Sequence, residues 1–230
     1  MKQMKAVIFD MDGVISNTVH LHYIVNKKVA DQLGISYSQE WNQQLQGLSR
    51  RDTVQSITRQ SAVTLSEQEF DQLCEQKNSH YKGLIDTLTV EDVQPGIRLF
   101  IEKLKKHEIP MVIASASRNA RRVLTRLELV DYFKGIVDVT TLKRGKPDPE
   151  IFIKAAELVD VNPSACVAIE DGEAGLKGIM ETEMFSVGVG AEPALTKADL
   201  YLPSTQELTV ESLETALNKQ QKTLFQEGKE

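Results

Sequence analysis

The sequence predicts an α/β protein: a doubly wound, Rossmann-like parallel sheet core with a small α-helical cap domain inserted into it. Short continuous apolar runs recur along the chain, amphipathic helical patterns separate most of them, and one long interval contains no such run. Continuous apolar runs are typical of strands that are buried on both faces. Their alternation with helices indicates a doubly wound sheet.

Six apolar runs are predicted to form the strands of this sheet. They cover residues 6–9, 111–114, 135–137, 166–169, 185–189 and 198–202. Helical stripes, with apolar residues three or four positions apart, lie at residues 99–104, 123–127 and 151–159. The last of these helices has a clear start signal, with Asp148 as its N-cap and Pro149 at its first helical position.

The interval from residue 17 to residue 91 interrupts the alternation of strands and helices. It contains no run of four apolar residues, and its patterns predict helices near residues 17–33, 50–60 and 66–82. A crossover between parallel strands needs only about a dozen residues. We therefore expect residues 17–91 to form a helical cap domain, and residues 1–16 and 92–230 to form the α/β core. The polar tail after Asn218 is expected to fray.

Composition excludes several classes of protein. The chain has 230 residues, of which 41% are apolar, and its 27 Lys and Arg against 33 Asp and Glu give a net charge of −6. This balance argues against nucleic-acid or membrane partners that bind through bulk positive charge. Only two cysteines are present, Cys74 and Cys166, and no signal peptide or membrane span is evident. We expect a cytoplasmic monomer that acts on a small molecule.

Polar side chains follow four separate apolar runs. Asp10 and Asp12 come after the first run, Ser115 after the second, Lys146 after the third, and Glu170 with Asp171 after the fourth. In open α/β sheets, ligands bind at the carboxyl ends of the strands. We therefore expect these groups to converge on one site.

The residue types at this site suit phosphoryl transfer. Carboxylates are hard oxygen ligands of the kind that Mg²⁺ prefers, together with water and phosphate oxygens. Lys146 supplies a positive charge, Ser115 supplies a hydroxyl, and backbone N–H groups of a helix beginning near Ser117 can hold an anion. Each residue alone is more typical of a turn, a cap or a solvated surface. Their ordered combination predicts a phosphoryl-transfer site in which Asp10 is the nucleophile and Asp12 the general acid–base.

The motifs resemble those of the haloacid dehalogenase superfamily. The supporting stretches are FDMDGV at residues 9–14, LQGLSR at 45–50, ASASRN at 114–119, GKPDP at 145–149 and IEDGEAG at 169–175. The likeness extends from Met4 to about Leu217, and within the superfamily it is strongest to the sugar-phosphate mutases that have a small helical cap. The resemblance implies an enzyme that interconverts β-glucose 1-phosphate and glucose 6-phosphate through an aspartyl-phosphate and a 1,6-bisphosphate.

The resemblance also implies a role for each site residue. Asp10, the carbonyl of Asp12, Glu170 and Asp171 would hold Mg²⁺, and the bond before Pro147 would be cis. The transferring phosphoryl group would be bound by Ser115, Ala116 and Lys146. The remaining residues would bind the sugar phosphate or position Asp12: Thr18, His22, Gly47, Leu48, Arg50, Lys77, Ser117, Arg118 and Asn119.

Two departures from the mutase pattern keep an alternative open. Gln46 stands where these mutases usually have Lys, and Asn26 where they usually have Trp. Both changes concern substrate recognition, so a Mg²⁺-dependent sugar-phosphate phosphatase is the second hypothesis. A third is a signalling module with a reversibly phosphorylated Asp, but such modules are about half as long, have no helical insert and leave Asp12 without a role.

Overall fold

The computed structural model describes residues 1–224 and contains a six-stranded, fully parallel sheet. The strand order is β4-β3-β2-β5-β6-β7, and a second, two-stranded parallel sheet joins β1 to β8. The strands are β1 Lys2–Gln3, β2 Ala6–Phe9, β3 Met111–Ile113, β4 Gly135–Ile136, β5 Cys166–Glu170, β6 Phe185–Val189, β7 Leu200–Leu202 and β8 Lys222–Thr223. This arrangement confirms the expected parallel α/β architecture.

Nine α-helices lie within the described residues, and five of them cover the sheet. Those five are α5 Ile97–Lys106, α6 Ala120–Arg126, α7 Glu150–Glu157, α8 Glu173–Met180 and α9 Val210–Lys219. The other four are α1 Val19–Gln32, α2 Gln39–Gln44, α3 Arg50–Thr58 and α4 Glu67–Ile85. Short 3₁₀ turns occupy Val90–Asp92, Val130–Tyr132, Val139–Thr141, Pro163–Ala165, Pro193–Lys197 and Thr205–Glu207.

Alternate residues of each strand face opposite layers of helices. In β2, Val7 and Phe9 pack into the larger apolar cluster with α5, α6 and α9, whereas Ala6 and Ile8 pack into a second cluster with α7. Every residue of β2 is fully buried. The continuous apolar runs of the sequence therefore reflect strands that are covered on both faces.

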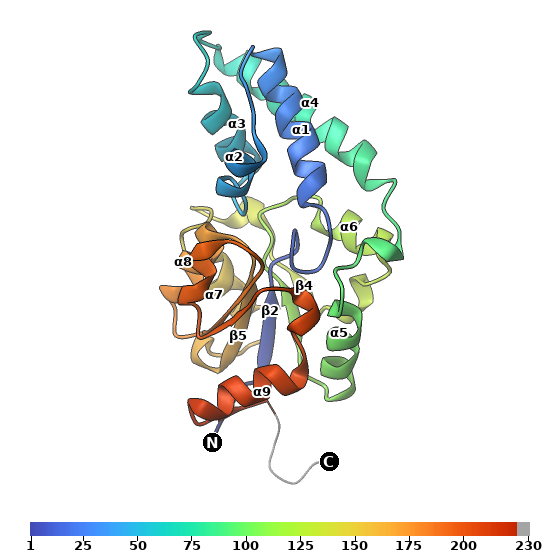
Figure 1. Cartoon of the computed structure of the whole chain (residues 1–230), viewed down its shortest axis with the longest axis vertical. Helices are drawn as coiled ribbons and strands as arrows, with labels where there is room; N and C mark the ends of the chain where they lie inside the picture. The colour runs from blue at the N-terminus through green and yellow to red at the C-terminus, as the bar shows by residue number, and fades with distance from the viewer. Residues whose placement is uncertain (225–230) are drawn as a thin grey trace.

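Helices α1 to α4 gather at one end of the sheet, above the carboxyl ends of its strands (Figure 1). A third apolar cluster, which includes Val29, Val54, Ile57 and Leu73, is formed by these helices and the loops that connect them. The chain leaves and re-enters the sheet region side by side, because Ser16 forms an antiparallel bridge with Val93. The Asn17 N–H donates to the Asp92 carbonyl at 2.8 Å, which pairs the two connections further.

Local details differ from the sequence expectations. Helix α7 begins at Glu150 with Pro149 as its N-cap, not at Pro149 with Asp148 as the cap, and Asp148 Oδ1 instead accepts the Glu150 N–H at 3.0 Å. The helix expected near Ser117 begins at Ala120. Helix α2 was not expected, because QEWNQQ has no apolar periodicity, although Ser38 caps it through the Trp41 N–H.

The chain beyond Asn218 does not fray within the described residues. Helix α9 ends at Lys219, and β8 pairs in parallel with β1, with Lys2 opposite Lys222. Leu224 is fully buried in the larger apolar cluster, which holds this segment against the core. Residues 225–230, which belong to the expected core, lie outside the described part of the chain. No helix within residues 1–224 combines the length and hydropathy needed to span a bilayer.

Phe100 offers a direct test of the larger core. Its side chain is 1% exposed and meets Phe9 edge to face, with ring centroids 6.0 Å apart. We expect Phe100→Ala to lower the free energy of unfolding by about 3–5 kcal/mol, because a buried aromatic side chain is lost and a cavity remains. Urea denaturation measures the change. Leu99→Ala on the same helix, where the side chain is 59% exposed, should stay within about 0.5 kcal/mol of wild type.

Candidate active site

Three strand ends and one loop bring the predicted reacting groups together. Asp10 directly follows β2, and Ser115 is the second residue after β3. Glu170 is the last residue of β5, and Asp171 comes next. Lys146 lies in the loop before α7, beside a cis Lys146–Pro147 bond, as the resemblance implies. Asp10, Lys146 and Glu170 are all almost completely buried.

Lys146 is the buried cation at the centre of this group. Its Nζ donates to Asp10 Oδ1 at 2.5 Å and to Glu170 Oε2 at 2.7 Å. Burial by itself lowers the pKa of Lys146, but the charges of Asp10 and Glu170 reverse this effect and raise the pKa above its usual value. Lys146 therefore remains a positive charge inside the site.

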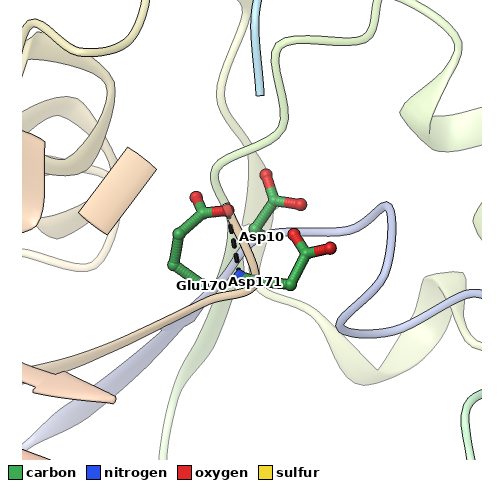
Figure 2. Close-up of side chains that lie close together, drawn as sticks. All are labelled: Asp10, Glu170 and Asp171. Carbon is green, nitrogen blue, oxygen red and sulfur yellow. Dashed lines mark hydrogen bonds between the residues drawn. The ribbon is translucent and has the colours of Figure 1, made fainter. Parts of the chain in front are cut away.

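Asp10, Glu170 and Asp171 form a compact group of carboxylates, with one oxygen of each within 4.8 Å of the others (Figure 2). Burial, followed by the charge of Glu170, raises the pKa of Asp10 to about 8. The same two causes raise the pKa of Asp171 well above its usual value. Lys146 alone does not compensate the three carboxylates. The excess of buried negative charge and the oxygen donors fit a divalent metal ion.

Two glycines leave the space in which these carboxylates lie. A Cβ on Gly13 would lie 1.9 Å from Asp171 Oδ2, and a Cβ on Gly175 would lie 1.8 Å from Glu170 Oε2. Gly13 also has φ = 94°, which other residues rarely adopt. The backbone around the acidic group is therefore shaped to hold these carboxylates in place.

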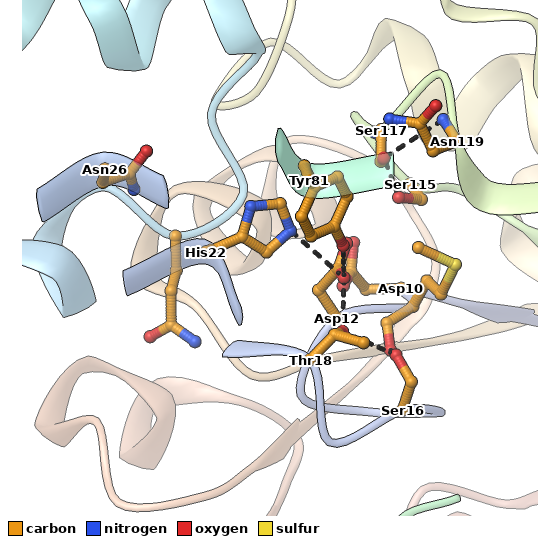
Figure 3. Close-up of polar contacts among 12 residues, drawn as sticks. Asp10, Asp12, Ser16, Thr18, His22, Asn26, Tyr81, Ser115, Ser117 and Asn119 are labelled. Atoms are coloured by element: carbon orange, nitrogen blue, oxygen red, sulfur yellow. Dashed lines mark hydrogen bonds and ion pairs between the residues drawn. The ribbon is translucent and has the colours of Figure 1, made fainter. Parts of the chain in front are cut away.

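Asp12 does not join the acidic group but faces the helices above the sheet. Its Oδ1 accepts hydrogen bonds from Thr18 Oγ1 at 2.5 Å and from the Tyr81 hydroxyl at 3.1 Å, and it lies 3.3 Å from His22 Nε2 (Figure 3). Burial raises the pKa of Asp12, but the charge and hydrogen bond of His22 and the bonds from Thr18 and Tyr81 outweigh it, so the pKa is lowered.

Tyr81 was not predicted as a site residue. It comes from α4, is 4% exposed, and stacks on the His22 ring with centroids 4.3 Å apart. Its only signal in the sequence is its position one helical turn after Lys77, a predicted site residue. Lys77 itself is not among the hydrogen-bond partners of Asp12 in the described part of the chain. It lines the cavity, where burial and then the charge of Arg50 lower its pKa to about 8.

A cavity of about 1200 Å³ separates α1 to α4 from the sheet. It is lined by Asp10, Asp12 and most of the other predicted site residues: His22, Gly47, Leu48, Arg50, Lys77, Ser115, Ala116, Ser117, Arg118, Asn119 and Lys146. Thr18, Glu170 and Asp171 are not among the lining residues. Thr18 instead donates to Asp12, and Glu170 and Asp171 belong to the acidic group with Asp10.

The loop after β3 lines the cavity, and hydrogen bonds to its serine and asparagine side chains order it. Ser115 Oγ accepts the Ser117 N–H at 3.1 Å, and Ser117 Oγ accepts the Asn119 N–H at 3.2 Å. Asn119 Nδ2 then donates to Asn78 Oδ1 of α4 at 3.0 Å. From α3, Arg50 Nη1 pairs with Glu75 of α4 at 2.9 Å. Hydroxyl, amide and guanidinium groups thus line the same cavity as Asp10.

Gln46 was expected only as a departure in substrate recognition, and the structure gives it a further contact. Its Nε2 donates to Asp171 Oδ2 at 2.8 Å. The sequence offers no signal for this bond, because it depends on how the helical insert sits over the sheet.

Comparison with known proteins identifies relatives over most of the chain. Residues 4–180 match the haloacid dehalogenase-like hydrolase family. The chain is 44% identical over 212 residues to the β-phosphoglucomutase of Bacillus subtilis. This alignment covers 91% of this chain and 94% of that protein. It is 31% identical over 176 residues to a phosphorylated carbohydrates phosphatase of Thermotoga maritima, covering 76% and 79% of the two chains.

Solved structures give the same relationship. The crystal structure of β-phosphoglucomutase from Clostridium difficile superposes with a TM-score of 0.91 at 38% identity, covering 95% of this chain and 99% of that one. CbbY from Rhodobacter sphaeroides, at 20% identity, has the same fold with a TM-score of 0.80, covering 92% and 99% of the two chains.

The space at Gly13 provides a test of the acidic group. We expect Gly13→Ala to displace the Asp171 carboxylate and to abolish divalent-cation binding, measured by titration calorimetry. Gly83→Ala is the matched control, because Gly83 lies in α4 with no neighbouring atom near its Cβ position. The control should bind the cation normally and gain up to about 1 kcal/mol of stability. Unchanged cation binding in Gly13→Ala would contradict this account of the site.

Proposed function

The chain belongs to the haloacid dehalogenase-like hydrolases, and from this premise we propose that it is a β-phosphoglucomutase-like enzyme. It interconverts β-glucose 1-phosphate and glucose 6-phosphate through an aspartyl-phosphate and glucose 1,6-bisphosphate. The observation that carries the proposal is the similarity to β-phosphoglucomutases over nearly the whole chain. The arrangement of Asp10, Lys146 and Asp12 around one cavity supports it.

In the proposed first step, phosphorylated Asp10 transfers its phosphoryl group to the 6-hydroxyl of β-glucose 1-phosphate. Asp12 takes the proton of that hydroxyl as the oxygen–phosphorus bond forms, and the Asp10 carboxylate is released. Lys146, held against Asp10, stabilises the negative charge of the group in transfer. Ser115 and Ala116 bind the same phosphoryl group.

In the second step, the bisphosphate turns round and returns the phosphoryl group from its 1-position to Asp10. Asp12 gives its proton to the departing sugar oxygen, and glucose 6-phosphate leaves. Arg50, Ser117, Arg118 and Asn119 hold the phosphate that is not reacting, with Gly47 and Leu48 beside the sugar. In either orientation of the bisphosphate, one phosphate is therefore bound at each end of the cavity.

We propose Mg²⁺ as the metal ion, bound by Asp10, the Asp12 carbonyl, Glu170 and Asp171. When bound, it would offset the repulsion between the anionic nucleophile and the anionic phosphate. Thr18 and His22 orient Asp12, as their contacts indicate, and Lys77 contributes charge near the substrate. Residues 17–91 act as a cap whose closure excludes water from the aspartyl-phosphate.

We further propose that the enzyme is a cytoplasmic monomer whose partner is a small-molecule sugar phosphate, not a nucleic acid or a membrane. Cys74 and Cys166 are both free and buried, which agrees with a reducing compartment.

A sugar-phosphate phosphatase remains the second candidate. The similarity to a phosphorylated carbohydrates phosphatase favours it, as do Gln46 and Asn26 in place of the usual mutase residues. In that case water, not a sugar hydroxyl, would accept the phosphoryl group from Asp10.

An assay with β-glucose 1-phosphate, Mg²⁺ and a trace of glucose 1,6-bisphosphate separates the two candidates. We expect glucose 6-phosphate to form, detected by a coupled dehydrogenase, with much slower release of inorganic phosphate. Asp10→Asn should abolish turnover because it removes the nucleophile. Phosphate release from a panel of sugar phosphates without any glucose 6-phosphate would favour the phosphatase instead.

Tyr81→Phe tests the support of Asp12 from the cap. The variant removes the hydroxyl that donates to Asp12 but keeps the ring that stacks on His22. A hydrogen bond to a charged group contributes about 1.5–3 kcal/mol, so we expect kcat to fall by about tenfold or more. Tyr201→Phe is the control, because the Tyr201 hydroxyl bonds to the Gly190 carbonyl and neither residue lines the cavity. Equal kcat values for the two variants would contradict a role for Tyr81.

A further inference from the structure

The loop between α2 and α3 connects the helical insert to the acidic group of the core. Gln46, in this loop, donates its amide N–H to Asp171 Oδ2 at 2.8 Å. Asp171 follows β5 and belongs to the group with Asp10 and Glu170 (Figure 2). A side chain from the insert thus contacts a proposed metal ligand directly.

The loop packs closely against the core at Gln46 and at the next residue, Gly47. A Cβ on Gly172 would lie 3.4 Å from Gln46 Cβ and 3.6 Å from the Gln46 carbonyl oxygen. Gly47, with φ = 77°, has its Cβ position 3.5 Å from Lys146 Cδ and 3.8 Å from the Gly175 nitrogen. Because glycines allow the close approach, the bond from Gln46 is part of a fitted contact and not the chance reach of a long surface side chain.

The hydrogen bonds of Asp171 show how Gln46 can orient its carboxylate. The Asp171 backbone N–H donates to Glu170 Oε1 at 3.1 Å, so Glu170 orients the backbone at this position. Gln46 is the side chain that donates to the Asp171 carboxylate within residues 1–224. Its amide is neutral, so it can orient a carboxylate without adding a positive charge that would compete with a metal ion.

We propose that Gln46 is a positioning residue that couples closure of the helical insert to binding of a divalent cation. The inference deepens the proposed function and rests on the cation that it assigns to Asp10, Glu170 and Asp171. Groups that hydrogen-bond metal ligands fix their orientation, and their removal typically weakens metal affinity by 10- to 100-fold. Gln46 reaches Asp171 only when the insert lies over the sheet, so closure tightens cation binding. By linkage, the cation stabilises closure to the same degree.

Gln46→Met tests the coupling, because methionine has a similar volume but no N–H group. Binding of Mn²⁺ to the metal-free, full-length protein is followed by electron paramagnetic resonance of the free ion. We expect about tenfold weaker binding than in wild type. Gln44→Met is the control: Gln44 is an exposed residue of α2 outside the cavity lining, and its variant should bind Mn²⁺ as wild type does.

Amide hydrogen exchange of residues 45–49 tests the reciprocal effect without any activity measurement. We expect Mg²⁺ to slow exchange in this loop in wild type and in Gln44→Met, and to slow it much less in Gln46→Met. The Mg²⁺-induced rise in unfolding midpoint, compared for each protein with its own metal-free value, should also be smaller in Gln46→Met. This comparison remains valid if Gln46→Met is less stable to begin with.

The outcomes separate this inference from the proposed function. Equal Mn²⁺ affinity in Gln46→Met and wild type would overturn the positioning role and leave the proposed mutase activity intact. Weaker Mn²⁺ binding with a Mg²⁺ effect on loop exchange equal to that in wild type would overturn the coupling. Failure of wild type to bind a divalent cation would overturn both the inference and the metal-dependent mechanism. Absence of mutase activity, with cation binding intact, would overturn the proposed substrate and leave the role of Gln46 standing.

Discussion

The contact of Lys146 with Asp10 and Glu170 is the interaction on which the rest of the structure depends. Charges removed from water are costly unless they are paired and hydrogen-bonded. Here one buried ammonium meets two buried carboxylates, with a third carboxylate, Asp171, beside them. The parallel sheet makes this possible, because β2 and β5 are neighbours and end at the same edge. The cis bond at Pro147 and the glycines at 13 and 175 belong to the backbone that surrounds this group.

The helical insert contributes contacts to the site groups that the sheet presents. Asp12 is supported by Thr18 from the first connection and by His22 and Tyr81 from α1 and α4. Asn119 of the core contacts Asn78 of α4, and Asp171 contacts Gln46. Each of these bonds joins a group at the edge of the sheet to a partner in the insert or its connection. The arrangement of the reacting groups is therefore a property of both units together.

Much of the sheet and of its acidic edge could be predicted from sequence, because both leave local signals. A strand buried on both faces must be continuously apolar, and Asp10 or Glu170 at its end is conspicuous for that reason. The contacts of Tyr81 and Gln46 could not be predicted, because they depend on the placement of the insert over the sheet. The pairing of β1 with β8 was missed for a similar reason, since two-residue strands at distant positions have no periodicity. The N-cap at Pro149, instead of Asp148, is a shift of one residue that propensity cannot resolve.

The pairing of Ser16 with Val93 has a consequence for the history of the chain. Because the outgoing and returning segments pair with each other, the residues between them leave and rejoin the α/β core at a single point. A different segment could be joined at this point without interrupting any of the six strands. Substrate recognition can then change in the inserted segment while the acidic edge of the sheet is kept. Mutases and phosphatases both occur among the relatives of this protein, in agreement with this view.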